Sequence, residues 1–169
     1  MNPAPGIVAS LHLHPPKGGA PLLSVASIEA VAGKGLVGDH RYFGRLSRHT
    51  GQPSRRQVTL IEREVLADHA RHLGVAPLRP GDARANIETE GIDLAGMVGR
   101  YLRVGTMLLQ VVQHRDPCAK MDALRPGLRA RMQPPCQGVL AVVVEPGFAR
   151  VGDRVTACNL DERGSVGGA

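Results

Sequence analysis

Glycine and proline interrupt this chain so often that few long elements can form. The 169 residues include 21 glycines and 13 prolines, which recur at short intervals along most of the sequence. Glycine weakens helix interiors and proline breaks them, whereas both are typical of the turns between short strands. We therefore expect a mainly β protein, a β-barrel or folded sheet with a few short helices. Strands and helices do not alternate regularly, which argues against a doubly wound sheet.

Apolar runs and turn signals locate the individual elements. The strongest helix signal covers residues 62–73, where apolar side chains recur at helical spacing. Thr59 and Glu62 have the spacing of a capping box, and Gly74 is the predicted end of this helix. Residues 117–124 and 126–132 are predicted to form short helices. Strands are expected at residues 7–13, 24–30, 57–60, 101–104, 107–113, 138–145 and 154–158, with turns at 105–106 and 146–147.

Length and composition indicate one globular domain. The chain is 43% hydrophobic and 21% charged, a balance typical of globular rather than disordered proteins. We assign residues 1–160 to a single domain and expect residues 161–169 to form a disordered tail. The longest aliphatic run, residues 139–144, is far shorter than the ~20 residues that span a bilayer. The first residues lack the pattern of a signal peptide, so we expect a cytoplasmic protein with no membrane partner.

The charge of the chain predicts a small anionic ligand. The formal net charge is +6, and 18 of the 21 cationic residues are arginines. Arginine makes planar, bidentate contacts to phosphates and carboxylates. Nucleic acid is not the expected partner, because aromatic residues make up only 2% of the chain and offer few surfaces on which bases could stack.

The segment Arg115-Asp116-Pro117-Cys118 is the first candidate for chemistry. Pro117 follows a predicted strand and is suited to the first position of a helix. Cys118 would then lie in the first helical turn, where free N–H groups and the helix dipole stabilise a thiolate. Arg115 would add positive charge beside it. The segment favours a nucleophilic or metal-binding thiolate, and an inert, half-buried cysteine is the alternative.

Two other regions offer candidate ligand contacts. Residues 40–61 contain five arginines and no acidic residue, and the adjacent Arg55 and Arg56 could hold a phosphate. A solvated basic loop is the alternative for this stretch. Asn86, in a polar segment, could donate a hydrogen bond to a ligand, although ordinary turn chemistry would also explain it.

The cysteines do not predict a disulfide framework, because there are three of them and no CxxC pair. His114 and Cys118 are four residues apart, and Cys136 could add a third zinc ligand. However, the paired short spacings of structural zinc sites are missing. Cys158 is interpreted as a core residue of the last strand. No Walker A, GxGxxG, GxSxG or HExxH motif is present, so most common nucleotide-binding and hydrolase assignments have no support.

Seven segments, taken in their order and spacing, resemble one known family. They are GLVGDH at 35–40, RQVTLI at 56–61, PGD at 80–82 running to NI at 86–87, GIDL at 91–94, GRYLRVG at 99–105, RDPC at 115–118 and VGD at 151–153. Together they resemble the MOSC domain, named for the C-terminal domain of molybdenum cofactor sulfurases, over about residues 6–157. The resemblance implies a mostly β, barrel-like fold in cytoplasmic proteins that act as sulfur carriers or as molybdenum-cofactor-binding reductases of N-hydroxylated compounds.

The resemblance also implies which residues carry the function. Cys118 stands at the position of the functional cysteine of the family, as molybdenum ligand or persulfide carrier. Arg56 and Asn86 match positions that contact cofactor or anion. Asp39 and His40 lie in a matching segment and are further cofactor-binding candidates, as is Arg115, which lies beside the cysteine.

This chain departs from the family pattern in one place and lacks two accompanying parts. The family often has Gly-Glu-Asn where this chain has Arg84-Ala85-Asn86, so one carboxylate is missing. There is no cysteine desulfurase domain, so the chain alone could not generate sulfane sulfur. The N-terminal β domain of the eukaryotic reductases is also absent.

Three functional hypotheses follow. In the first, the chain binds the molybdenum cofactor (molybdopterin) with Cys118 as metal ligand and has reductase or transfer activity. In the second, Cys118 carries a persulfide for a partner, either a cysteine desulfurase or a molybdoenzyme. Molybdenum and sulfane sulfur are both soft partners of a thiolate, so the residues leave these two open. In the third, the fold serves another ligand or a regulatory role.

Overall fold

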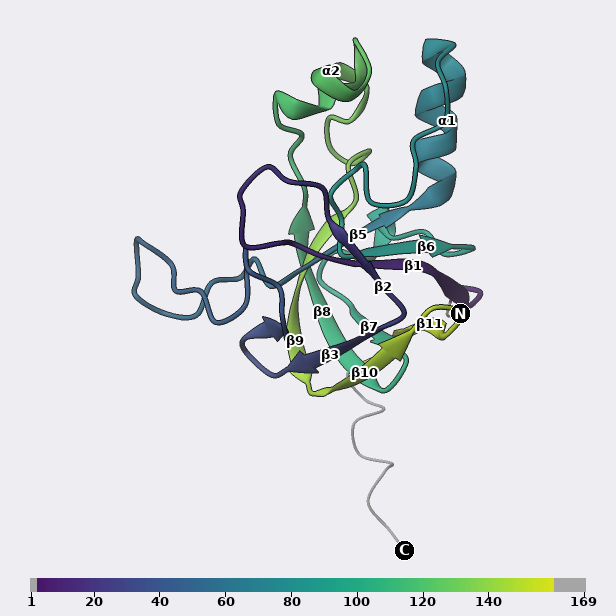
Figure 1. Cartoon of the computed structure of the whole chain (residues 1–169). Coiled ribbons are helices and arrows are strands. Elements are labelled where there is room, and N and C mark those ends of the chain that lie inside the picture. The colour runs from purple at the N-terminus through teal and green to yellow at the C-terminus, as the bar shows by residue number, and fades with distance from the viewer. Residues whose placement is uncertain (1–2, 160–169) are drawn as a thin grey trace, which may run out of the picture.

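The computed structural model describes residues 3–159 and shows a β-barrel capped at one end by helices (Figure 1). The strands are β1 Gly6–Leu13, β2 Leu23–Val25, β3 Ser27–Val31, β4 Gly35–Leu36, β5 Val58–Glu62, β6 Ile87–Glu90, β7 Tyr101–Val104, β8 Met107–His114, β9 Val139–Glu145, β10 Gly147–Arg150 and β11 Arg154–Cys158. The helices are α1 Arg63–Leu73, α2 Lys120–Leu124 and α3 Leu128–Arg131, with a short 3-10 turn, Ala95–Met97. The expected mainly β fold with a few short helices is confirmed. The predicted tail, residues 161–169, lies outside the described residues.

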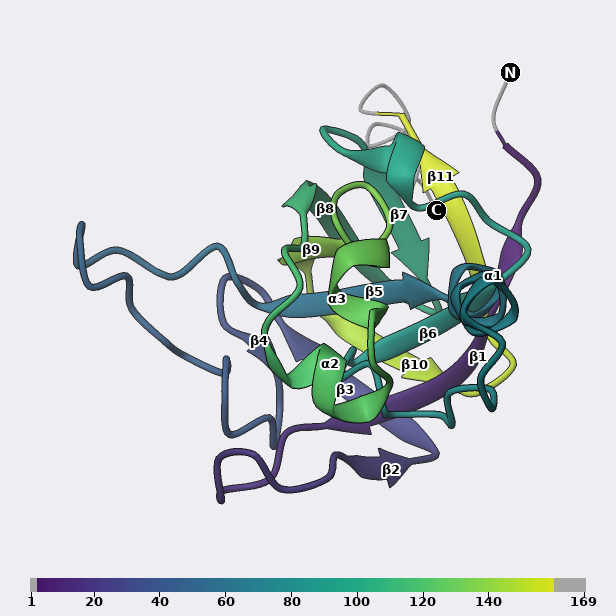
Figure 2. The same ribbon diagram turned by 90° about the horizontal axis from the view of Figure 1, so that it is seen from above.

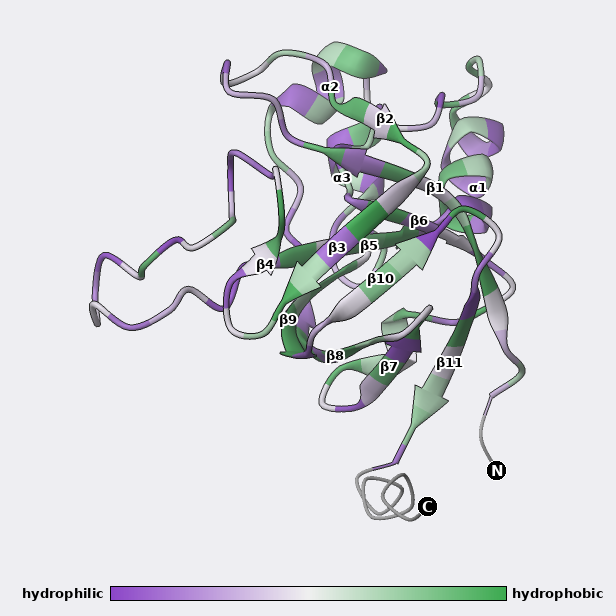
Figure 3. Cartoon of the chain, turned by 60° about the horizontal axis from the view of Figure 1, so that its bottom comes forward, coloured by the Kyte–Doolittle hydropathy of each residue, from purple (hydrophilic) through white to green (hydrophobic). Residues whose placement is uncertain are grey.

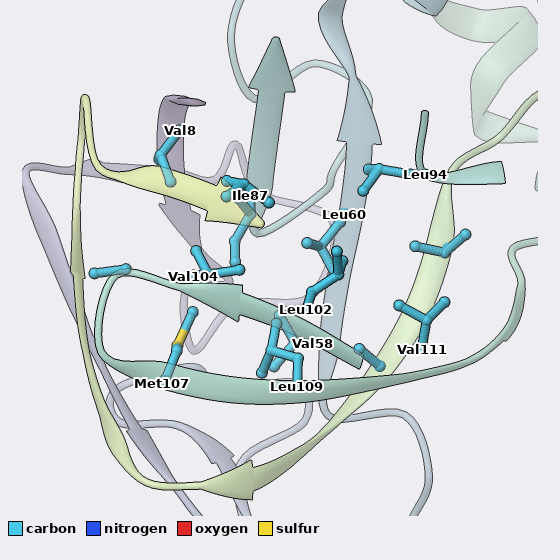
Figure 4. Packing of buried hydrophobic residues seen from close by; sticks show 14 of the residues in the cluster. Val8, Val58, Leu60, Ile87, Leu94, Leu102, Val104, Met107, Leu109 and Val111 are labelled. Carbon is cyan, nitrogen blue, oxygen red and sulfur yellow. The ribbon is translucent and has the colours of Figure 1, made fainter. Parts of the chain in front are cut away.

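Within the described residues, seven strands close the barrel in the order β11, β7, β8, β9, β5, β6 and β1. β1 completes the ring because its first residues pair with β11, its middle pairs with β6, and its last residues pair with β2. The pairings are antiparallel except for β5 and β6, which run parallel. Closure leaves few free strand edges. The barrel interior is filled by aliphatic side chains such as Leu60, Leu102 and Leu109, none of which is exposed to solvent (Figure 4).

A second, three-stranded sheet corrects two sequence predictions. Residues 24–30 were expected to form one strand, but the chain bends at Ala26 and separates β2 from β3. These two strands join different sheets, because β2 pairs with β1 whereas β3 pairs with β10 and β4. Residues 146–147 were expected to be a turn, but Gly147 begins β10 at once. The spacing of apolar and turn residues within a few positions does not reveal which strand a segment pairs with, so the sequence did not predict these breaks.

The three helices lie together at one end of the barrel (Figure 2). Gly74 ends α1 in the left-handed conformation, at φ 61°, as the sequence predicts. The predicted capping box is wrong, because Thr59 lies inside β5 and Glu62 accepts a hydrogen bond from the Leu94 N–H. A separate apolar cluster packs beneath the helices and contains Ile61, Leu66, Leu78, Ala83, Ala85, Met121, Leu128 and Met132.

The loop between β4 and β5 projects from the side of the barrel (Figure 1). It carries the arginine-rich stretch and is coloured largely hydrophilic in Figure 3. A single bridge between Leu46 and Pro53 holds its outer part together. No helix in residues 3–159 has the length and apolar character that crossing a membrane would require.

Candidate functional site

A cavity of about 400 Å³ opens at the helix-capped end of the barrel. Its wall comes from segments far apart in the sequence: the end of β1, the loop after β4, the segment before β6, the end of β8 with the RDPC segment, and the start of β9. The lining residues are His14, Arg41, Tyr42, Arg56, Ala83, Arg84, Gln113, Arg115, Asp116, Cys118, Ala119, Lys120, Met121, Gln137 and Leu140. The structure therefore brings Cys118, Arg115 and Arg56 together, three of the residues singled out in the sequence.

Cys118 lines this cavity as an exposed, free thiol. The prediction that it lies in the first turn of a helix is wrong, because α2 begins at Lys120 and has only five residues. The chain stays extended past β8, since the Arg115 N–H donates to the Gly138 carbonyl and Asp116 precedes a proline. A helix dipole therefore does not explain the reactivity expected of Cys118. The cations in the same cavity wall are the remaining feature of the structure that would favour an anionic group there.

Arg115 is a half-buried cation that has no carboxylate partner within residues 3–159. Its guanidinium donates to three carbonyl oxygens, those of Gln137, Ala83 and Arg84, at 3.3–3.4 Å. Burial lowers the pKa of Arg115 to about 10, although the nearby Tyr42 hydroxyl and Cys118 thiol oppose this shift. The group therefore stays charged near neutral pH, and its partial desolvation strengthens its attraction for an anion.

The other cations of the cavity are also unpaired. Arg41, Arg56, Arg84 and Lys120 form no ion pair with any described residue, and Asp116 is the one carboxylate in the lining. Five cations against one carboxylate leave a strongly positive wall. Such a wall is suited to a ligand with a phosphate or another multiply charged anion.

Arg84 places a cation on the cavity wall from an unusual backbone conformation. It is the one non-glycine residue in the described chain with a positive φ, 58°, a conformation that glycine adopts without strain. This backbone conformation costs of order 1–3 kcal/mol for a residue with a side chain, and it places the Arg84 side chain in the cavity wall. The neighbouring Ala85 is fully buried in the apolar cluster beneath the helices, so a carboxylate at this position would not face the cavity.

Asp39 lies behind the cavity wall, 2% exposed, in a set of five hydrogen bonds. It accepts from the His14 backbone N–H at 3.0 Å, His14 Nδ1 at 2.8 Å, the Arg41 and Tyr42 N–H groups, and Asn86 Nδ2 at 2.8 Å. Burial by itself raises the pKa of this carboxyl. The hydrogen bonds from His14 and Tyr42 overcome that effect and lower the pKa to about 2. Asp39 is therefore an anion that positions His14 and the following loop.

Asn86 is fully buried and does not line the cavity. Its amide oxygen accepts from the Thr59 N–H and hydroxyl, and its nitrogen donates to the His12 carbonyl and to Asp39. These bonds use both ends of the amide, so Asn86 supports Asp39 from behind. His40 is exposed and is not part of the cavity wall either.

Gln137 is a functional candidate that the sequence did not reveal. It is 2% exposed and lines the cavity, yet its Oε1 atom has no hydrogen-bond partner in the described structure. Gly138 fixes its position, because this residue has a φ of 84° and a Cβ there would lie 2.1 Å from the Leu60 carbonyl oxygen. An unpaired buried acceptor is costly, so a ligand that donates an N–H here would stabilise the site.

His14 and Tyr42 were also missed. They contact each other edge to face, with ring centroids 5.2 Å apart, and both line the cavity. Only the order HLHPP around His14 could have drawn attention to it, and a lone histidine carries little signal. The zinc alternative gains no support, because residues 3–159 hold no cluster of three His, Cys, Asp or Glu side chains suited to a metal ion. Cys158, expected in the core, is only half buried.

The chain matches one protein-family model and several solved structures. The family model described as the MOSC domain matches residues 39–156. The YuaD protein from Bacillus subtilis has a similar structure, with a TM-score of 0.76 and 18% identity over 94% of this chain and 100% of that one. YiiM from Geobacillus stearothermophilus has a TM-score of 0.68 and 19% identity, over 91% of this chain and 75% of that one. At these identities the structures show a shared fold. No curated protein matches significantly.

Proposed function

The chain belongs to the MOSC domain family, whose members are associated with the molybdenum cofactor, and from that premise we propose that it binds this cofactor with Cys118 as the metal ligand and reduces N-hydroxylated compounds. The observation that carries the proposal is the position of Cys118, an exposed thiol in the same cavity as five cations, none of them paired with a carboxylate in the described chain. A thiolate is a soft ligand that suits molybdenum, and the cations suit the phosphate of a pterin cofactor.

The donor set fits the cofactor at three separate points. Cys118 would ligate the metal, and Arg115 would stabilise the thiolate because the two groups lie close enough to interact electrostatically. Arg56 and Arg84 would hold the phosphate. The unpaired Gln137 Oε1 would accept a hydrogen bond from a pterin N–H. When bound, the cofactor would supply two-electron chemistry, and the protein would supply binding, orientation and proton transfer.

The exposure of Cys118 also supports a second candidate function, that of sulfur carrier. The Cys118 thiolate would attack the outer sulfur of a persulfide on a cysteine desulfurase, and the donor cysteine would leave as a thiolate. Cys118 would then hold the persulfide for an acceptor such as a molybdoenzyme. The positive cavity would stabilise the anionic form of either species.

Metal analysis of protein expressed with the cofactor available tests the first proposal. We expect molybdenum in the wild type and its loss in Cys118→Ser, with both proteins equally stable because the side chain is exposed. Cys158→Ser is the matched control and should keep its molybdenum, since Cys158 does not line the cavity. Equal molybdenum in wild type and Cys118→Ser would contradict the ligand assignment. A wild type without molybdenum that gains one sulfur atom at Cys118 from a desulfurase and cysteine would favour the carrier.

A further inference from the structure

We propose that His14, held by Asp39, is the proton-transfer group for the reaction in the Cys118 cavity. This inference rests on the proposed reductase function and assigns a catalytic role to a residue that the family motifs do not include. His14 lies at the end of the barrel strand β1, is 3% exposed, and lines the cavity with Cys118 and Arg115. Two contacts fix its ring, the hydrogen bond from Nδ1 to Asp39 and the edge-to-face contact with Tyr42, and the His14 backbone N–H also donates to Asp39.

The bond between His14 and Asp39 defines which ring nitrogen faces the ligand. The distance from His14 Nδ1 to Asp39 Oδ2 is 2.8 Å, and both residues are buried. An ionised carboxylate can only accept, so Nδ1 must carry the hydrogen. In the neutral ring, Nε2 is then left with a lone pair. No described residue forms a hydrogen bond with Nε2, although His14 lines the cavity, so this atom is available to a ligand.

The surroundings of Asp39 keep this tautomer fixed. Besides His14, the Asp39 carboxylate accepts from the N–H groups of Arg41 and Tyr42 and from Asn86 Nδ2. Every one of these partners donates, so the carboxylate stays ionised and cannot exchange its role with the histidine. Asp39 is therefore a positioning residue: it orients the ring and stabilises the protonated imidazole, as a buried aspartate does in hydrolytic triads.

The proposed reaction requires a proton donor inside the cavity. When R–NH–OH becomes R–NH2 and water, the N–O bond breaks and the substrate takes up two electrons and two protons. A bound molybdenum cofactor would supply the two electrons, and an external electron donor would have to restore them. One proton would pass from Nε2 of the protonated His14 ring to the departing hydroxyl oxygen, and the second would reach the amine nitrogen from solvent, which would also protonate His14 again. Of the side-chain types that line the cavity, imidazole is the one that ordinarily exchanges protons near neutral pH.

Charged and titratable groups from several segments of the chain face the cavity that His14 lines. Asp39 and Tyr42 contact His14 directly, and the cavity adds Arg41, Arg56, Arg84, Arg115, Asp116, Cys118 and Lys120. An anionic cofactor would neutralise part of the positive charge of this wall.

The tautomer can be measured without cofactor, by nitrogen NMR of the labelled full chain. We expect the His14 signals to show a hydrogen on Nδ1 and a free lone pair on Nε2. Asp39→Asn should reverse this, because the asparagine amide can donate to Nδ1 and leave the hydrogen on Nε2. A wild-type ring with its hydrogen on Nε2 overturns the proposal, whether or not the protein binds molybdenum.

Kinetics of the molybdenum-loaded protein test the role itself. His14→Gln should retain its molybdenum but reduce an aromatic N-hydroxylamine about 100-fold more slowly, and the rate should lose its decline at alkaline pH. His72→Gln, at an exposed position on α1, is the matched control and should behave as wild type. An unchanged rate and pH profile in His14→Gln overturns the inference while leaving the proposed function intact. A wild type that binds molybdenum but reduces no such compound overturns the reaction and the role of His14 together.

Discussion

Two clusters of charge near the helix-capped end of the barrel differ in how they are paired. In the first, the fully buried Glu88 forms an ion pair with Arg63 and accepts from the Gly81 N–H. His12 lies beside it, with its Nε2 atom 4.0 Å from Glu88 Oε1, and burial lowers the pKa of His12 despite the opposing effect of Glu88. In the second, the cavity, five cations have no carboxylate partner among residues 3–159.

The charges of the Glu88 cluster are paired within the protein, whereas the cations of the cavity have no described carboxylate partner. The Glu88 cluster closes on itself and ties the loop before β6 to α1. Among the cavity cations, Arg84 and Arg115 donate to carbonyl oxygens and Arg41 lies over the Tyr42 ring. None of the five has a carboxylate partner among the described residues, so their charge can attract an anionic ligand. We expect changes in the first cluster to affect folding and changes in the second to affect binding.

Glu88→Ala should have the largest effect on stability. It leaves the partly buried Arg63 guanidinium without its carboxylate and the Gly81 N–H without an acceptor, which should cost about 3 kcal/mol. Urea denaturation at neutral pH measures this as a fall in the free energy of unfolding. Glu145→Ala is the matched control, because Glu145 pairs with Arg103 near the surface, and it should cost less than ~1 kcal/mol. Equal losses in the two variants would contradict the distinction.

Asp39 should show an intermediate effect that depends on pH. Its folded pKa, about 2, lies below the ordinary 3.8, so its ionised form stabilises the fold above pH 4 and this contribution is lost as the pH falls toward 2. The shift corresponds to about 2 kcal/mol. The difference in unfolding free energy between wild type and Asp39→Asn should therefore shrink between pH 4 and pH 2. A constant difference over this range would mean that the charge of Asp39 contributes nothing.

Arg115→Gln should have the smallest effect on stability and a clear effect on binding. Burial disfavours the charged guanidinium, so its removal should change the free energy of unfolding by no more than about 1 kcal/mol. Pyrophosphate should raise the melting temperature of the wild type and raise that of the variant much less. Arg103→Gln, outside the cavity, should respond to pyrophosphate as wild type. Loss of folding in Arg115→Gln would place this residue with the Glu88 cluster instead.

Local sequence signals predicted most helices and strands of the fold and one segment of the candidate site, residues 115–118. The α1 helix, its end at Gly74 and the β7–β8 hairpin follow from side-chain period and turn residues, which act over a few positions. Cys118 and Arg115 were recognised because they stand in one short segment. Asn86 was expected at the ligand, yet its amide is used entirely by Thr59, His12 and Asp39. Whether a polar side chain faces a ligand or a neighbour depends on residues distant in sequence.

The amino-acid sequence alone determined that this chain forms short strands closed by turns and carries one cysteine in a positively charged segment. Those properties follow from glycine, proline, apolar spacing and charge, which are local. The tertiary structure decided that His14 meets Asp39, which lies 25 residues away, and that Arg41, Arg84 and Arg115 line the same cavity as Cys118. Barrel closure brings these residues together, and a hydrogen bond or an unpaired charge exists only once the distance between two groups is set.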